Sequence, residues 1–197
     1  MLQDKLKGFD IILASASPRR KQLLDGIDLE FKIETGGDIE EIFDSTMDVM
    51  MVPEYLAELK STKFARKLNN NEILITADTM VLCEKEILGK PLDRQHAVEM
   101  LGKLSGKKHQ VLTGVFIRSN FKSRSFTALT DVYFRDLSVN EIEYYVDKYK
   151  PYDKAGAYGA QEWIGYIAIS RIEGSYFNVM GLPVQRLYLE LDKFLTD

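Results

Sequence analysis

The sequence lacks the features that send a protein out of the cell or into a membrane. Cys83 is the only cysteine among 197 residues, so no intrachain disulfide and no cysteine-based zinc cluster can form. The first ten residues carry charges where a signal peptide has its apolar segment, and no apolar run approaches the roughly 18 residues of a membrane span. We therefore expect a protein of the reducing cytoplasm, without a membrane partner.

Basic residues are not in excess either. Lysine and arginine number 26 against 30 acidic residues, which gives a formal charge of −4 and a pI near 5.4. Binding along a nucleic-acid backbone needs a broad surface of lysine and arginine. The composition therefore disfavours a general nucleic-acid binder, and a small polyanion is the more natural partner.

Internal repeats, low-complexity tracts and linker-like composition shifts are also missing, which indicates one domain over residues 1–197. What is present is an alternation of short apolar runs with helix signals, typical of an α/β fold. The pattern predicts strands at 10–14, 31–35, 73–83, 110–118, 124–134 and 164–172. It predicts helices at 19–25, 53–68, 93–104, 138–149 and 183–195.

The most distinctive segment is Ser15-Ala16-Ser17-Pro18-Arg19-Arg20, which joins the first strand to the first helix. A helix N-terminus has unpaired backbone N–H groups and partial positive charge, and therefore binds phosphate oxygens. Ser17 can cap the helix and Pro18 suits its first position, while Arg19 and Arg20 offer donors that match phosphate geometry. The alternatives are a capped helix with two solvated arginines and a basic phosphorylation site.

Two ionisable residues fall where apolar ones are expected. Asp78 interrupts the central apolar strand, and a buried carboxylate needs a partner or a metal. It could act as a catalytic base or magnesium ligand, or bond a neighbouring turn. Lys63 falls at helical spacing from Leu56 and Leu59, so it either replaces a core residue for a purpose or extends to the surface.

Three loops complete the candidate site. An acidic loop carries four carboxylates (Asp38, Glu40, Glu41, Asp44), and Leu88-Gly89-Lys90-Pro91 presents a lysine between a glycine and a proline. The glycine-rich segment 153–161 allows close backbone approach to a ligand and ends in Gln161, whose amide can recognise a base edge. Each pattern alone also fits an ordinary turn.

Together, in order and spacing, these segments closely resemble the Maf family of nucleotide pyrophosphatases. The resemblance runs from about Ile11 to Leu191. Its motifs are Ser-x-Ser-Pro-Arg-Arg at 15–20, Ala-Asp-Thr at 77–79, Leu-Gly-Lys-Pro at 88–91, Leu-Ser-Gly-Lys at 104–107, His-x-Val at 109–111, Thr-Gly at 113–114, Asp-Lys-Ala-Gly-Ala-Tyr-Gly at 153–159 and the 178–183 run. Several such strings in order make the resemblance specific.

The resemblance implies an elongated α/β fold like that of inosine-triphosphate pyrophosphatases, with a mixed sheet, flanking helices, a cleft between two lobes and frequently a homodimer. It implies hydrolysis of a nucleoside triphosphate to the monophosphate and pyrophosphate with Mg²⁺ or Mn²⁺. Asp78 matches the proton acceptor, and Arg19, Thr79 and Gln161 match positions associated with the dTTP/UTP branch. Glu41, or alternatively Glu40, matches a loop glutamate.

On this basis we expect Ser15, Ser17, Arg19 and Arg20 to hold the triphosphate, with Lys63 and Lys90 neutralising its charge. Asp78 would activate the attacking water, and Glu41 with Asp78 would hold the metal. The competing interpretations are a non-catalytic, nucleotide-sensing regulator of septum formation, a 7-methyl-GTP specificity, and modified pyrimidine nucleotides as the main substrates.

Overall fold

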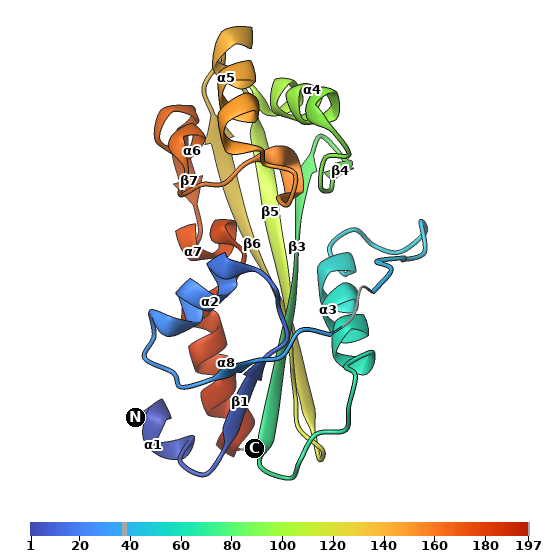
Figure 1. The fold of residues 1–197 in the computed structure, drawn as a ribbon, viewed down its shortest axis with the longest axis vertical. Coiled ribbons are helices and arrows are strands. Elements are labelled where there is room, and N and C mark those ends of the chain that lie inside the picture. The colour runs from blue at the N-terminus through green and yellow to red at the C-terminus, as the bar shows by residue number, and fades with distance from the viewer. Residues whose placement is uncertain (37–38, 197) are drawn as a thin grey trace. The chain divides into compact units, whose positions relative to one another are not determined.

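The computed structural model describes residues 1–36 and 39–196; Asp38 of the expected acidic loop lies outside them. The chain is α/β, with a seven-stranded mixed sheet in the order β2-β1-β3-β5-β6-β7 and β4 paired to β3 (Figure 1). The predicted α/β class with a mixed sheet and flanking helices is therefore confirmed. Among the described residues, no helix has the length and apolar character needed to cross a membrane.

The chain divides into two compact units, neither of which is continuous in sequence. The first comprises Met1–Asp78, Thr113–Ala128 and Gly181–Asp197, and the second comprises Thr79–Leu112 and Leu129–Met180. Three long strands contribute residues to both units: β3 (Glu72–Cys83), β5 (Lys108–Arg118) and β6 (Ser123–Phe134). The backbone passes from one unit to the other between Asp78 and Thr79, within the motif predicted for chemistry.

In the first unit, the apolar run Ile11 to Leu13 forms β1 (Asp10–Leu13), which is buried and pairs in parallel with β2 (Lys32–Ile33) and β3. Parallel strands covered by helices are built from such continuous apolar runs. The helices α2 (Pro18–Asp25) and α8 (Val184–Thr196) lie on one side of the strands, and α3 (Val52–Thr62) lies on the other (Figure 1). A short helix, α1 (Leu2–Lys5), precedes them.

In the second unit, β4 (Glu86–Leu88) folds back on β3. Asp93 caps α4 (Arg94–Leu104) by accepting a bond from the His96 backbone, and the predicted Ser138–Glu141 capping box opens α5 (Val139–Tyr149). The remaining elements are the short 3-10 helix η1 (Ala155–Ala157), α6 (Trp163–Ala168), β7 (Ile169–Glu173) and α7 (Tyr176–Met180).

Besides the strand expected over 31–35, which is limited to Lys32–Ile33, two predicted elements are wrong in type or extent. The expected strand over 164–172 is a helix, α6, followed by the strand β7, because Ile164 and Ala168 are buried at the four-residue spacing of one helix face. The helix expected to reach residue 68 ends at Thr62, and Lys63 is its C-cap. The second difference matters for the candidate site.

Candidate functional site

The first part of the site is the turn between β1 and α2. Ser17 is the N-cap residue with an extended backbone, and Pro18 begins the helix, as predicted. Ser15 is buried, and its hydroxyl oxygen accepts bonds from the Ser17 backbone N–H at 3.2 Å and from Arg20 Nη1 at 3.4 Å. The Ser17 side chain makes no capping hydrogen bond, so its hydroxyl does not cover the first-turn N–H groups that an anion would bind.

Arg20 is tied to this turn and to the segment before α8. Its Nε donates to the Gly181 carbonyl oxygen at 2.8 Å, which fixes the guanidinium while Nη1 contacts Ser15. Burial lowers the pKa of Arg20, and the negative charges of Asp78 and Glu41 oppose that shift. Arg20 is therefore close enough to both carboxylates to interact with their charges. Arg19, its neighbour in sequence, is half-buried.

The centre of the site is a pair of carboxylates joined by a lysine. Asp78 is 6% exposed on β3, and its Oδ1 accepts a 2.5 Å bond from Lys60 Nζ. The same ammonium lies 2.8 Å from Glu41 Oε1. Glu41, not its neighbour Glu40, is thus the loop carboxylate that the structure brings to Lys60 and Asp78.

Lys60 reaches Asp78 because α3 lies directly on the sheet. A Cβ added to Gly114 of β5 would stand 2.2 Å from the Pro53 carbonyl group, so only glycine allows this approach. The Thr76 hydroxyl of β3 donates to the Ala57 carbonyl oxygen of α3 at 2.6 Å. Thr76 and Asp78 share one face of the strand, and Ala57 and Lys60 share one face of the helix.

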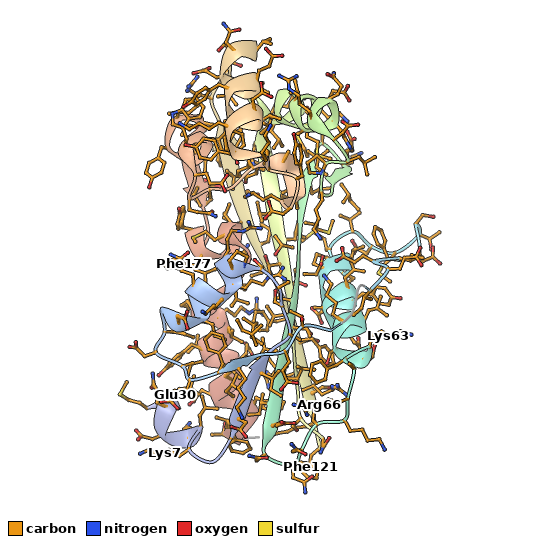
Figure 2. All side chains as sticks on the ribbon, in the orientation of Figure 1. Lys7, Glu30, Lys63, Arg66, Phe121 and Phe177 are labelled. Atoms are coloured by element: carbon orange, nitrogen blue, oxygen red, sulfur yellow. The ribbon has the colours of Figure 1, made fainter. Side chains whose placement is uncertain are left out.

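Lys63, the predicted phosphate-binding lysine, does not lie on that face. The buried face of α3 includes Val52, Leu56 and Ala57, whereas Lys63 is exposed beyond the last helical turn. Figure 2 shows its side chain pointing away from the helix. The expectation that Lys63 interrupts the apolar face is corrected: the structure brings Lys60, which sequence reasoning missed, to the carboxylates.

The carboxylates determine which cation could bind. Among residues 1–36 and 39–196, no three carboxylate, histidine or cysteine side chains group as a metal site would require. Glu41 and Asp78 are nonetheless hard oxygen donors that converge on one cationic group. Mg²⁺ is commonly held by one or two carboxylates together with substrate phosphates. The pair therefore fits a cation that completes its shell with ligands from elsewhere.

The second unit holds the other predicted residues. Thr79, partly exposed, follows Asp78 on β3, and Lys90 is exposed on the loop after β4. The Gly156 backbone N–H donates to the Gly89 carbonyl oxygen at 3.0 Å, so two of the motif loops lie side by side. A Cβ on Gly156 would stand 2.9 Å from Val81, and its φ of +67° favours glycine.

A buried polar network fixes the loop that leads to Gln161. Lys154 is 7% exposed, and its ammonium lies 2.7 Å from Asp153 Oδ1 and 3.1 Å from Glu162 Oε1. The Tyr145 hydroxyl donates to Glu162 and accepts from the Gly159 N–H at 3.1 Å. Asp153 and Lys154 are the two charged residues of the Asp-Lys-Ala-Gly motif. Because they pair with each other, they have a structural role in holding the loop.

Gln161 itself is only half-buried, but its Oε1 is enclosed and has no hydrogen-bond partner among the described residues. A buried amide oxygen without a partner is costly and uncommon. It is therefore a group that a ligand with an N–H donor would satisfy.

The comparisons with known proteins agree with the motifs. A model of the Maf-like protein family matches residues 10–194. The chain is 51% identical to the dTTP/UTP pyrophosphatase of Porphyromonas gingivalis over 97% of both chains. It is 50% identical to the protein of that name from Bacteroides thetaiotaomicron, over 95% of this chain and 97% of that one.

Among solved structures, a HAM1 protein from Coxiella burnetii aligns with 94% of this chain and 99% of its own, at 14% identity and a TM-score of 0.45. The inosine-triphosphate-pyrophosphatase part of the expected fold stays a prediction. The family model and the relatives each cover nearly the whole sequence. The chain belongs to the Maf-like protein family.

Proposed function

We propose that this protein hydrolyses dTTP and UTP to the nucleoside monophosphate and pyrophosphate. The names of relatives about 50% identical to it support this substrate class. The observation that carries the proposal is the buried Asp78, bonded to Lys60 and close to Arg20 at the start of α2. A carboxylate, a lysine and an arginine beside a helix N-terminus are the groups that phosphoryl transfer needs for positioning and charge stabilisation.

The turn at α2 would hold the phosphates. Backbone N–H groups of the first helical turn, the Ser15 hydroxyl and the Arg20 guanidinium offer donors in one small region. The Gly181 carbonyl fixes the orientation of Arg20, so part of the entropy of placing its side chain is lost before the ligand arrives. Ser17, Arg19 and Lys90 extend the proposed phosphate contacts, as the family motifs imply.

Asp78 would take the proton of the attacking water. The water oxygen forms a bond to the α-phosphorus, the bond from that phosphorus to the bridging oxygen breaks, and pyrophosphate leaves with the electron pair. The water proton passes to the Asp78 carboxylate. Lys60 orients that carboxylate through its 2.5 Å bond and supplies a positive charge near the phosphates.

Glu41 and Asp78 would hold a divalent cation, Mg²⁺ or Mn²⁺. When bound, such a cation stabilises negative charge that develops on the phosphate oxygens. The two carboxylates contribute hard oxygen ligands, and Glu41 comes from a loop rather than from the sheet.

Gln161 would recognise the base. Its enclosed Oε1 requires a donor, and the N3–H of thymine or uracil is one, while its amide N–H₂ can donate to a carbonyl oxygen of the same ring. Cytosine has no N3–H and presents an acceptor at that position, so it could satisfy Oε1 only through its 4-amino group. Arg19 and Thr79 accompany Gln161 in this proposed preference.

The role of Asp78 is tested by replacing its carboxylate with an amide of the same shape. Asp78→Asn should lower kcat by roughly 10²- to 10⁴-fold, the usual contribution of a general base, while thermal unfolding shows a folded protein. Near-normal kcat in Asp78→Asn would exclude Asp78 as the base.

Glu41→Gln should lower activity more than Glu40→Gln, because Glu41 alone of these two lies against Lys60.

A further inference from the structure

Four charged side chains of the first unit interact at one place. Lys60 Nζ lies 2.8 Å from Glu41 Oε1 and 2.5 Å from Asp78 Oδ1. The negative charges of both carboxylates also act on Arg20 and raise its pKa against the effect of burial. These two negative and two positive groups give a formal sum of zero, and Arg19, whose charge also acts on Arg20, adds one positive charge. In the protein alone, the carboxylates that would bind a cation are thus already compensated.

The ammonium of Lys60 is bonded to oxygens of both proposed metal ligands. A divalent cation would have to displace the ammonium from those oxygens and, with the ammonium still nearby, would raise the local sum by two positive charges. Lys60 is only 19% exposed and Asp78 only 9% by side chain, so solvent would screen that excess charge poorly. Cation binding to the protein alone is therefore unfavourable.

A nucleoside triphosphate changes this balance. Its phosphates bring several negative charges and additional oxygen ligands, which is the usual way in which Mg²⁺ is held at nucleotide sites. The lysine side chain is long and flexible, so its ammonium can exchange a carboxylate for a phosphate oxygen. The charge that the cation adds is then compensated.

We propose that Lys60 takes the place of the divalent cation in the nucleotide-free protein, so that the cation binds only together with the triphosphate. The inference rests on the proposed function, because it assumes that Glu41 and Asp78 are the metal ligands. It adds a specific role for Lys60: this residue makes metal binding dependent on substrate.

The test is Mn²⁺ binding to the full chain, measured by the electron paramagnetic resonance of free Mn²⁺. Wild type should show no saturable site below about 1 mM Mn²⁺, and one site when a non-hydrolysable α,β-methylene analogue of dTTP is added. Lys60→Met should bind Mn²⁺ without nucleotide at least about tenfold more tightly than wild type. Adding Asp78→Asn to that variant should abolish the new site.

Lys63→Met is the matched control, since it removes an exposed lysine three residues along the chain; its Mn²⁺ binding should equal that of wild type. Lys60→Gln is the second variant if Lys60→Met does not fold. Tight Mn²⁺ binding by nucleotide-free wild type would overturn the inference, as would unchanged binding in a folded Lys60 variant. Failure of the analogue to bind any variant would instead overturn the proposed function.

Discussion

Lys60 lies in the last turn of α3, and Lys63, three residues later, is the C-cap of that helix. Of the two, only Lys60 contacts Asp78 and Glu41. Leu56 predicts a buried face that includes its i+4 neighbour, which is Lys60. A buried face that passes through Leu56 and Leu59 instead predicts Lys63. Leu59 is only half-buried, so the signal for Lys60 was present in the spacing but could not be separated from its alternative.

Also at the residue scale, His109 is a buried neutral side chain whose lowered pKa makes the stability of the protein depend on pH. It is 1% exposed, its Nε2 lies 2.9 Å from the Tyr158 hydroxyl, and its ring packs edge-on against Phe134. Burial lowers the pKa of His109 to about 4 from its usual value near 6.5. In the unfolded chain the ring therefore binds a proton at a higher pH than in the folded protein.

This difference predicts a loss of stability on mild acidification. Above pH 6.5 the histidine is neutral in both states; below it the unfolded chain gains a proton that the folded protein does not, until pH reaches about 4. The free energy of unfolding should fall by about 2 kcal/mol between pH 7.5 and 5. Urea unfolding at both pH values measures it.

His109→Phe is the comparison, because it keeps a ring and removes the titrating group. The pKa values of Glu72 and Glu141 are lowered to about 2, so their stabilisation is lost only below the pH of this window. An equal pH dependence in wild type and His109→Phe would show that the histidine is not its source.

At the scale of the element, α3 and β3 act as a matched pair. The Thr76–Ala57 bond is the neighbour of the Asp78–Lys60 bond, because Thr76 lies two residues before Asp78 on the strand and Ala57 lies three residues before Lys60 on the helix. It therefore sets how near the two charged groups come. Gly114 permits this approach at the first turn of α3, and Ser125 and Thr127 of β6 donate to Glu54 there. The helix is thus held at several points along its length.

Thr76→Val should impair chemistry more than binding. It replaces the hydroxyl with a methyl of similar size and removes the 2.6 Å bond to Ala57; a small displacement of Lys60 from Asp78 should lower kcat roughly tenfold with little change in KM. Thr76→Ser, which keeps the hydroxyl, should restore most of the rate. Steady-state kinetics measure both constants.

Ser125→Ala is the control for a general loosening of α3. It removes a bond to Glu54 at the other end of the helix, and should lower the free energy of unfolding by up to about 1 kcal/mol without the fall in kcat. Equal losses of kcat in Ser125→Ala and Thr76→Val would argue against a positioning role for Thr76.

Local signals predicted several elements well. The apolar run of β1, the Asp93 cap of α4 and the capping box of α5 involve neighbours in sequence, and all three are present. The segment 164–172 failed because its isoleucines suit a buried helix face as well as a strand. The close approach at Gly114 joins segments about 60 residues apart, which no local pattern can reveal.

At the scale of the whole molecule, the boundaries of the two units could not be predicted from the sequence. Each unit is assembled from separate segments, and β3, β5 and β6 contribute to both. No composition shift marks these boundaries, because a strand that leaves one unit enters the next without a linker. Family membership, by contrast, was predictable, since eight motifs occur in order along the chain.

The central claim is that the chain cleaves pyrimidine triphosphates between the α- and β-phosphates. Its most direct test is to incubate the protein with Mg²⁺ and dTTP, UTP, CTP, GTP or 7-methyl-GTP in turn, with 5-methyl-UTP and pseudo-UTP as further substrates, and to identify the products. The account predicts equimolar monophosphate and pyrophosphate, fastest from dTTP, UTP or their modified forms. Release of inorganic phosphate together with nucleoside diphosphates would contradict this prediction. So would the absence of turnover despite tight nucleotide binding.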